Sequence, residues 1–321
     1  MKDILKVKRL KRVAFVTLGI SIICMSYFKE ASKWRVDILS TVKLSNHSLG
    51  ENIKVLSNEE LNSKIGVYSW DINDLFNDRL TVASLCDNLK IDEIFQEIPS
   101  NYLNDDLSNA INELQKDVKK KVEISYLCGN PSWYSDSSYG KSKIDELVKY
   151  NLNYGDENAI EKVVFDIEPW VLGISNWEDD FLKTIKEIYS YANLKKITFL
   201  LTILFWLDTS EDINDKNIYK EIIKNSHGVI IMNYNRHVYD KGIDNELYYA
   251  KKNGKIIYSA AETQAPIDIY GVYDSTTYYN VGLDKLRGDW QYLKNKYKYF
   301  NLGFVYHDLS SLKNITYNVK L

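Results

Sequence analysis

The sequence predicts an α/β fold, a (β/α)8 or TIM barrel, and two observations lead to this class. From Lys64 onward, short apolar runs rich in β-branched and aromatic residues alternate with longer segments whose apolar residues recur every three or four positions. Such alternation predicts parallel strands joined by right-handed helical crossovers. The chain holds eight of these units, and a length of roughly 250 residues is typical of such a barrel.

The eight predicted strands follow directly from the apolar runs. They span residues 65–71, 92–98, 122–129, 162–170, 196–206, 228–235, 255–262 and 301–308. The helical pattern is clearest over residues 105–121, with Ser and Asp near the start, and over residues 177–194. A doubly wound sheet is the alternative, but it needs a glycine-rich phosphate turn after an early strand. The first strand ends in Ser-Trp-Asp-Ile-Asn-Asp instead, so the barrel is preferred.

The N-terminus predicts export. Residues 2–12 contain six Lys and Arg residues, and residues 13–28 form an apolar run without charge. A basic flank of this kind stays cytoplasmic, so the rest of the chain is expected outside. We interpret residues 1–28 as a basic flank with a membrane anchor, a cleaved signal segment being the alternative. Residues 29–63 then form a stalk and residues 64–321 the barrel, at the extracellular face of the membrane or secreted.

Composition narrows the function classes. The 321 residues are 45% hydrophobic with a net charge of -3, which permits a large core but gives no basic footprint for nucleic acid. The 25 Tyr and 7 Trp residues suit carbohydrate binding, although most of the tyrosines are expected to pack in the interior. The three cysteines lack the spacing of a disulfide framework or a zinc site. No metal ion and no cofactor are therefore expected.

The C-terminal ends of the predicted strands collect polar and aromatic residues. A (β/α)8 barrel builds its active site at this end, so these residues are the candidates for binding substrate. They are Trp70, Asn130, Trp133, Tyr134, Trp170, Trp206, Asn233, Tyr234, Tyr306 and His307. Because surface loops are polar by default, the collection and not any one member carries the prediction.

Two acids end the fourth strand in the stretch VVFDIEPW. Side chains alternate along a strand, so Asp166 and Glu168 share a face, which should point into the barrel. An isolated buried carboxylate is costly, and the bland alternative is an acid pair held by a neighbouring Lys or Arg. Glu262 ends the seventh strand. Two carboxyl groups across a cleft are what glycosidic cleavage needs, one as proton donor and one as nucleophile or base.

The chain resembles the clan A retaining glycoside hydrolases, which are (β/α)8 barrels. These enzymes carry an acid/base Glu, often followed by Pro, at the end of the fourth strand, and a nucleophile Glu at the end of the seventh. Glu168-Pro169 and Glu262 match both positions. The resemblance implies that Glu168 is the general acid/base and Glu262 the nucleophile. An Asn normally precedes the acid/base, whereas this chain has Ile167.

The chain also resembles the family 18 chitinase-like group. Its fourth strand ends in D-x-x-D-x-D-x-E, and Asp166-Ile167-Glu168 matches the last part of that motif, with Val164 in place of the middle Asp. Met232-Asn233-Tyr234-Asn235 is similar to the group's Met-x-Tyr-Asp, with Asn235 in place of Asp. This resemblance implies a substrate-assisted reaction. The N-acetyl group of the sugar is then the nucleophile, Asp166 orients it and Glu168 is the acid.

The sequence thus predicts a glycoside hydrolase that cleaves an extracellular or cell-envelope polysaccharide. The two-glutamate scheme is preferred because Glu262 falls at the end of the seventh strand. In that scheme Asp166 tunes Glu168, Tyr234 hydrogen-bonds near the nucleophile, and His307 or Tyr306 lines the floor of the sugar site. Two alternatives stay open, a barrel that binds glycan without cutting it and an enolase-type Mg²⁺ barrel. A phosphodiesterase would need more histidines at the strand ends.

Overall fold

The structure is a computed structural model that describes residues 63–318, except for 209–216, 238, 240–241 and 268–271. The predicted anchor and nearly all of the predicted stalk lie outside the described residues. Within them, no helix combines the length and the apolar character needed to cross a membrane.

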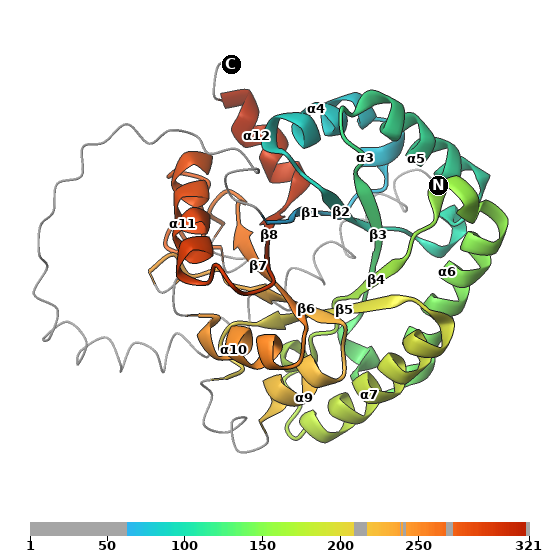
Figure 1. Cartoon of the computed structure of the whole chain (residues 1–321), viewed down its shortest axis with the longest axis vertical. Coiled ribbons are helices and arrows are strands. Elements are labelled where there is room, and N and C mark those ends of the chain that lie inside the picture. Colours follow the sequence, from blue (N-terminus) through green and yellow to red (C-terminus); the bar gives the residue numbers. More distant parts are fainter. Residues whose placement is uncertain (1–62, 209–216, 238, 240–241, 268–271, 319–321) are drawn as a thin grey trace, which may run out of the picture.

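Eight parallel strands close into a barrel in which each strand pairs with its neighbour in the sequence and β8 pairs with β1 (Figure 1). This confirms the predicted (β/α)8 fold. The strands are β1 (Ile65–Ser69), β2 (Glu93–Glu97), β3 (Glu123–Cys128), β4 (Lys162–Phe165), β5 (Thr198–Leu204), β6 (Gly228–Met232), β7 (Ile256–Glu262) and β8 (Leu302–His307). Several are shorter than predicted. In particular, β4 ends one residue before Asp166, whereas the prediction ran to Trp170.

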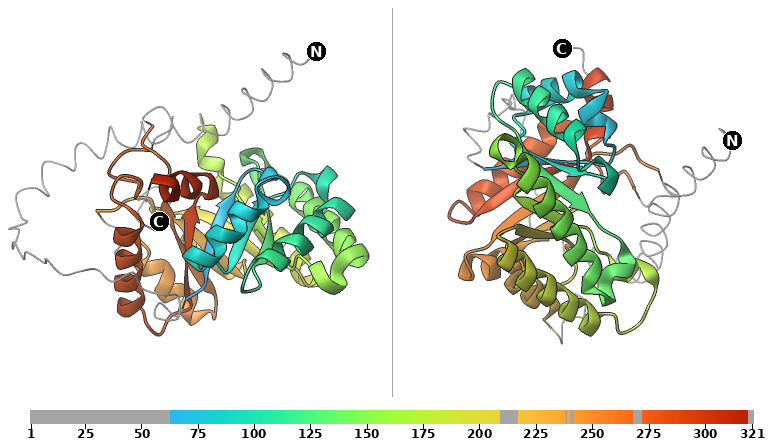
Figure 2. Two further views of the ribbon diagram at one scale, coloured as in Figure 1. Left: turned by 90° about the horizontal axis from the view of Figure 1, so that it is seen from above. Right: turned by 90° about the vertical axis from the view of Figure 1, so that its right-hand side faces the viewer.

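Helices surround the barrel, and two further views show them flanking the strands on the outside (Figure 2). They are α3 (Asn73–Phe76), α4 (Arg79–Leu89), α5 (Asp105–Asp117), α6 (Ser137–Asn158), α7 (Glu178–Lys195), α9 (Ile218–Lys224), α10 (Asp244–Lys252), α11 (Leu283–Lys296) and α12 (Leu309–Asn318). The final helix, α12, packs against α4 and β1 and so closes the ring. Three short 3-10 helices follow β2, β3 and β4: η1 (Ser100–Tyr102), η2 (Pro131–Ser135) and η3 (Pro169–Leu172).

Strand alternation divides the apolar residues into two clusters, one between the strands and the helices and one inside the barrel. The inner cluster contains Tyr68, Phe95, Leu127, Val164, Leu200, Ile230, Tyr258, Ala260 and Val305. Because Val164 points inward, the residues two and four positions later continue the inner face of the fourth strand beyond its C-terminal end. This places Asp166 and Glu168 above the filled interior.

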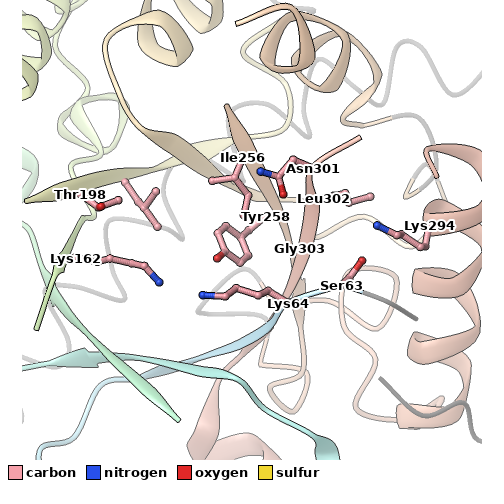
Figure 3. Close-up of a pocket in the computed structure, with 11 residues that line it drawn as sticks. Ser63, Lys64, Lys162, Thr198, Ile256, Tyr258, Lys294, Asn301, Leu302 and Gly303 are labelled. Carbon is pink, nitrogen blue, oxygen red and sulfur yellow. The ribbon is translucent and has the colours of Figure 1, made fainter. Parts of the chain in front are cut away.

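The N-terminal end of the barrel is closed by a charged network. Glu93 is fully buried and accepts hydrogen bonds from Lys162 at 2.8 Å, Ser125 at 2.5 Å and Tyr258 at 3.2 Å. Lys64 lies 3.8 Å from the same carboxylate. A cavity of about 370 Å³ opens beside this network, and the ammonium groups of Lys64 and Lys162 approach each other beneath the Tyr258 hydroxyl (Figure 3). At this end the buried acid is therefore neutralised by lysines.

Candidate active site

The carboxyl pair of β4, Asp166 and Glu168, lies at the C-terminal end of the barrel. Asp166 continues the pairing of β4 with β3, because its backbone N–H donates to the carbonyl of Cys128 at 3.0 Å. Phe165 and Ile167 are fully buried, whereas the two acids are half-buried. The predicted alternation, with the acids on one face and the apolar residues on the other, is confirmed.

A glycine on the neighbouring strand makes room for this arrangement. Gly129 follows β3, and a Cβ atom placed on it would lie 2.0 Å from the carbonyl oxygen of Asp166. Any side chain at position 129 would therefore displace the backbone that carries Asp166. The close approach of the two strand ends depends on the absence of a side chain here.

Of the two carboxyl groups, that of Glu168 has the higher pKa. Its Oε2 accepts a hydrogen bond from the indole N–H of Trp170 at 3.0 Å. Burial, reinforced by the charge of Asp166, raises the pKa of Glu168 to about 8. Burial also raises the pKa of Asp166, to about 6, and nearby His307 opposes that rise. Both pKa values are raised, and that of Glu168 is raised further, so Glu168 is the member of the pair that favours the acid form.

Glu262 and His307 form a second pair on β7 and β8, where the strand register places them side by side. His307 Nδ1 lies 3.0 Å from Glu262 Oε2, and the backbone N–H of Gln264 donates to Oε1 at 2.7 Å. Burial lowers the pKa of His307, but the charge and hydrogen bond of Glu262, together with the charges of Asp308 and Asp166, outweigh this effect and raise the pKa to about 9. Glu262 therefore has both oxygens engaged, and His307 carries a positive charge at neutral pH.

Aromatic side chains enclose these groups. Trp70 stacks on Tyr68 with ring centroids 5.6 Å apart, and His307 contacts both rings edge-on. Tyr234 lies over His307, with centroids 5.4 Å apart. Trp70, Tyr234 and His307, which the sequence predicts to bind substrate, thus pack together beside Glu262, and their binding role stays a prediction.

Two residues of this region were absent from the sequence prediction. Tyr68 points inward from β1, and its hydroxyl lies 2.9 Å from Thr202 Oγ1 on β5. Burial raises the pKa of this phenol well above its ordinary value, and the nearby carboxyl groups of Asp166 and Glu168 raise it further. The alternation of side chains along a strand could have predicted this position, because Tyr68 lies two residues before Trp70 and therefore on the same face.

Three predicted substrate-binding residues lie elsewhere. Tyr306 is fully buried on the outer face of β8, where its hydroxyl accepts a hydrogen bond from Arg287 at 3.2 Å. Asn233 is also fully buried, and its side-chain amide donates to the Tyr239 carbonyl at 2.9 Å. Trp133 stacks on Tyr139 of α6 with centroids 5.8 Å apart. Tyr306 and Asn233 are thus fully buried and bonded to the protein, which argues against their predicted role as substrate ligands. Trp133 is half-buried, and its predicted role stays a prediction.

The four other predicted ligands sit at the edge of the region. Trp170 is largely buried against Trp177 and Trp206, so its contribution is the hydrogen bond to Glu168. Trp206 is half-buried. The exposed Asn130 caps η2 by accepting from the Ser132 N–H at 2.9 Å, and Tyr134 packs partly against the outer core. The described residues contain no cluster of three or more His, Cys, Asp or Glu side chains that could hold a metal ion.

Fold and site together define a class, a (β/α)8 barrel with a carboxyl pair above β4 and an aromatic surround. No family model and no curated protein matches the chain. Among solved structures, the fold is similar to a GH18 chitinase from Pseudoalteromonas aurantia, with 12% identity, coverage of 80% of this chain and 100% of that one, and a TM-score of 0.53. A chitinase from Bacteroides thetaiotaomicron shows 12% identity, coverage of 79% and 94%, and a TM-score of 0.50. At this identity the likeness establishes a shared fold with family 18 chitinases.

Proposed function

We propose that the protein is a glycoside hydrolase that cleaves a polysaccharide or oligosaccharide, with Glu168 as the proton donor. The observation that carries the proposal is the half-buried carboxyl pair above β4, in which Glu168 keeps a proton beside an ionised Asp166. A glycosidic oxygen needs a proton donor that stays protonated near neutral pH. The aromatic rings around the pair offer flat apolar faces suited to sugar rings, and the fold shared with chitinases supports the same reaction class.

The contacts favour Asp166 over Glu262 as the partner of Glu168. Asp166 Oδ1 is buried and has no hydrogen-bond partner in the described part of the chain, so its capacity to accept a hydrogen bond is unused. Glu262 already accepts hydrogen bonds on both oxygens. In the nucleophilic role predicted for Glu262, these two hydrogen bonds would lower the nucleophilicity of its carboxylate oxygens. The substrate-assisted scheme is therefore the better fit.

In that scheme Glu168 transfers its proton to the glycosidic oxygen as the bond from this oxygen to the anomeric carbon breaks. The carbonyl oxygen of the sugar's N-acetyl group bonds to the anomeric carbon, while the Asp166 carboxylate accepts a hydrogen bond from the N-acetyl N–H. Water then attacks the anomeric carbon and gives a proton to Glu168. This step restores the N-acetyl group and the acid form of Glu168.

The first experiment measures reducing ends released by the full-length protein from chitin oligomers, peptidoglycan, galactosaminoglycan and β-glucans. We expect Glu168→Gln to lower kcat on the cleaved substrate by about 10²- to 10⁴-fold, because Gln cannot donate the proton. Glu161→Gln is the matched control, since Glu161 is exposed and precedes β4 at the opposite end of the same strand. Full activity of Glu168→Gln would overturn the proposal. Binding without release from any glycan would support a non-catalytic glycan-binding barrel.

A second comparison separates the two schemes. The substrate-assisted reaction predicts that an N-acetylated oligomer is cleaved and that its de-N-acetylated counterpart is not. It also predicts that Asp166→Asn lowers kcat far more than Glu262→Gln does. Equal cleavage of both oligomers, together with a covalent glycosyl intermediate on Glu262, would restore the two-glutamate scheme.

The N-terminal sequence supports a location for this activity, at the outer face of the cell membrane or beyond it. The basic flank and apolar run of residues 1–28 are the basis of that proposal. Fractionation of cells with externally added protease tests it. We expect the barrel to be digested in intact cells or recovered from the medium, whereas full protection inside intact cells would contradict it.

A further inference from the structure

The carboxyl pair of β4 lacks the partner that a buried acid ordinarily has. In the described part of the chain, no Lys or Arg forms an ion pair with Asp166, Glu168 or Glu262. The cation that faces these acids is the imidazole of His307. A histidine in this place differs from a lysine, because its charge depends on a hydrogen-bonded neighbour.

Several contacts fix the imidazole in one orientation. Nδ1 lies 3.0 Å from Glu262 Oε2, and the side chains of Glu262 and His307 are only 5% and 14% exposed. Thr263 holds the backbone of β8, since its N–H and its hydroxyl both donate to the His307 carbonyl, at 2.7 Å and 2.8 Å. The rings of Tyr68, Trp70 and Tyr234 pack around the imidazole. The ring therefore cannot turn away from the acids without breaking these contacts.

Among the groups around His307, Glu262 has the largest influence on whether the imidazole is protonated. Six titratable groups face it. They are Tyr68 in β1, Glu262 in β7, Asp166 and Glu168 after β4, Tyr234 after β6 and Asp308 after β8. Burial raises the pKa of both phenols well above the ordinary value, so both stay neutral. Asp308 accepts hydrogen bonds from Ser311 and from the Gln264 side chain. Among the carboxylates that the structure describes, Glu262 is the one hydrogen-bonded to the imidazole.

We propose that Glu262 and His307 are a positioning pair, in which Glu262 holds a protonated imidazole against the carboxyl pair of β4 so that Asp166 stays ionised while Glu168 keeps the proton. A positive charge near two carboxyl groups favours ionisation of both. Its relative effect is largest on the carboxyl group whose pKa is influenced by the fewest other groups. His307 lowers the pKa of Asp166 as the main effect opposing burial, whereas on Glu168 it is the smallest of four effects.

The inference rests on the proposed function for its role in catalysis, but the charge arrangement can be tested without a substrate. Histidine ring nitrogens and Asp and Glu carboxyl carbons of the full-length protein, labelled with ¹⁵N and ¹³C, are titrated by NMR. We expect His307 to stay doubly protonated to about pH 9 in the wild type. Glu262→Gln should bring that titration down to the ordinary histidine range or below, because burial then acts without the opposing carboxylate.

The variant His307→Phe keeps an aromatic ring in place and removes the charge. We expect the Asp166 titration to move upward by about one pH unit or more. If the hydrolase proposal holds, both limbs of the pH profile of kcat/KM move upward as well, since both carboxyl groups ionise less readily without the imidazolium. A purely structural role would lower kcat/KM and leave both limbs in place. His237→Phe, at an exposed histidine, is the control.

The outcomes separate the two proposals. A His307 ring that is neutral at pH 7 in the wild type, or an Asp166 titration unmoved by His307→Phe, would overturn the positioning pair whatever the glycan assays give. The expected titrations without cleavage of any glycan would sustain the pair and defeat the hydrolase. If His307→Phe does not fold, the wild-type and Glu262→Gln titrations still decide the matter.

Discussion

The two ends of the barrel both enclose carboxyl groups, but they treat the charge in opposite ways. At the N-terminal end, Glu93 is surrounded by Lys162, Lys64 and two hydroxyl donors. At the C-terminal end, Asp166 and Glu168 have no lysine or arginine partner among the described residues, and Asp166 Oδ1 accepts no hydrogen bond there. The first arrangement is satisfied without a ligand, whereas the second leaves protons and lone pairs available.

This contrast teaches how to tell a structural acid from a reactive one within a single fold. A buried carboxylate that is paired with a cation costs the native state little free energy. Removing either partner destabilises the native state, because the other charge is then buried without a partner. A buried carboxyl group without one raises its pKa and destabilises the charged form, which suits acid catalysis. The comparison therefore predicts opposite responses to neutralising substitutions at the two ends.

The largest effect is expected at the N-terminal end. Glu93→Gln removes the buried charge that Lys162 and Lys64 face and leaves Glu123, which is half-exposed, as the remaining acid partner of both lysines. We expect the free energy of unfolding to fall by about 3 kcal/mol, measured by urea denaturation at pH 7. Glu161→Gln, an exposed change beside the same network, should stay within about 0.5 kcal/mol of the wild type. A loss below about 1 kcal/mol for Glu93→Gln would remove the distinction between the two ends.

A smaller and opposite effect is expected at the C-terminal end. The folded-state pKa of Glu168 is about 8 and its ordinary value is 4.5, so the folded state binds more protons than the unfolded chain between these values. Stability therefore falls as the pH rises through this window, and His307, whose pKa is also raised, adds a fall of the same sign at higher pH. At about 1.4 kcal/mol per pH unit these two shifts set an upper bound of several kcal/mol. Because both side chains are only half-buried and solvent screens their charges, we expect an actual loss on the order of 2 kcal/mol between pH 5 and pH 9.

Glu168→Gln checks that assignment, because it should flatten the dependence of unfolding free energy on pH and leave the variant more stable than the wild type at pH 9. The same denaturation series run at each pH provides the comparison. An unchanged slope in Glu168→Gln, equal to that of Glu161→Gln, would mean that another group causes the loss.

The smallest effects involve two tyrosines. Tyr258→Phe removes a hydroxyl that donates to Glu93, and Tyr68→Phe removes one that bonds to Thr202. Each change should lower the unfolding free energy by about 1 kcal/mol. Only Tyr68→Phe should also lower kcat/KM on the cleaved glycan, because Tyr68 borders the carboxyl pair. Equal effects of the two changes on kcat/KM would contradict the conclusion that only the C-terminal end of the barrel takes part in the reaction.

Much of the fold was accessible from the sequence, because the alternation of strand and helix patterns is a local signal. The carboxyl pair was accessible for the same reason, since Asp166 and Glu168 lie two positions apart on one strand end. The contact between Glu262 and His307 depends on the register of β7 and β8. This register cannot be read from the local pattern of either strand. Tyr306 and His307 are adjacent in the chain, yet alternation turns one outward and the other inward.

Other differences come from tertiary packing. Asn233 follows β6 directly and is a plausible ligand by position, but the Tyr239 carbonyl and Ser259 capture its amide. Trp133 belongs to η2, whose turn directs its ring against Tyr139 and Phe165. The sequence pattern around Asn233 and Trp133 does not predict either set of contacts.

The glycine beside Asp166 has a consequence for how this protein tolerates change. Gly129 touches no proton donor and offers no functional group, yet a Cβ there would fall 2.0 Å from the Asp166 carbonyl oxygen. In a library of random substitutions screened for activity, position 129 should therefore be as intolerant as the acids themselves. A ring beside the carboxyl pair can be exchanged for another ring of similar shape, but the close approach of the two strand ends admits glycine alone.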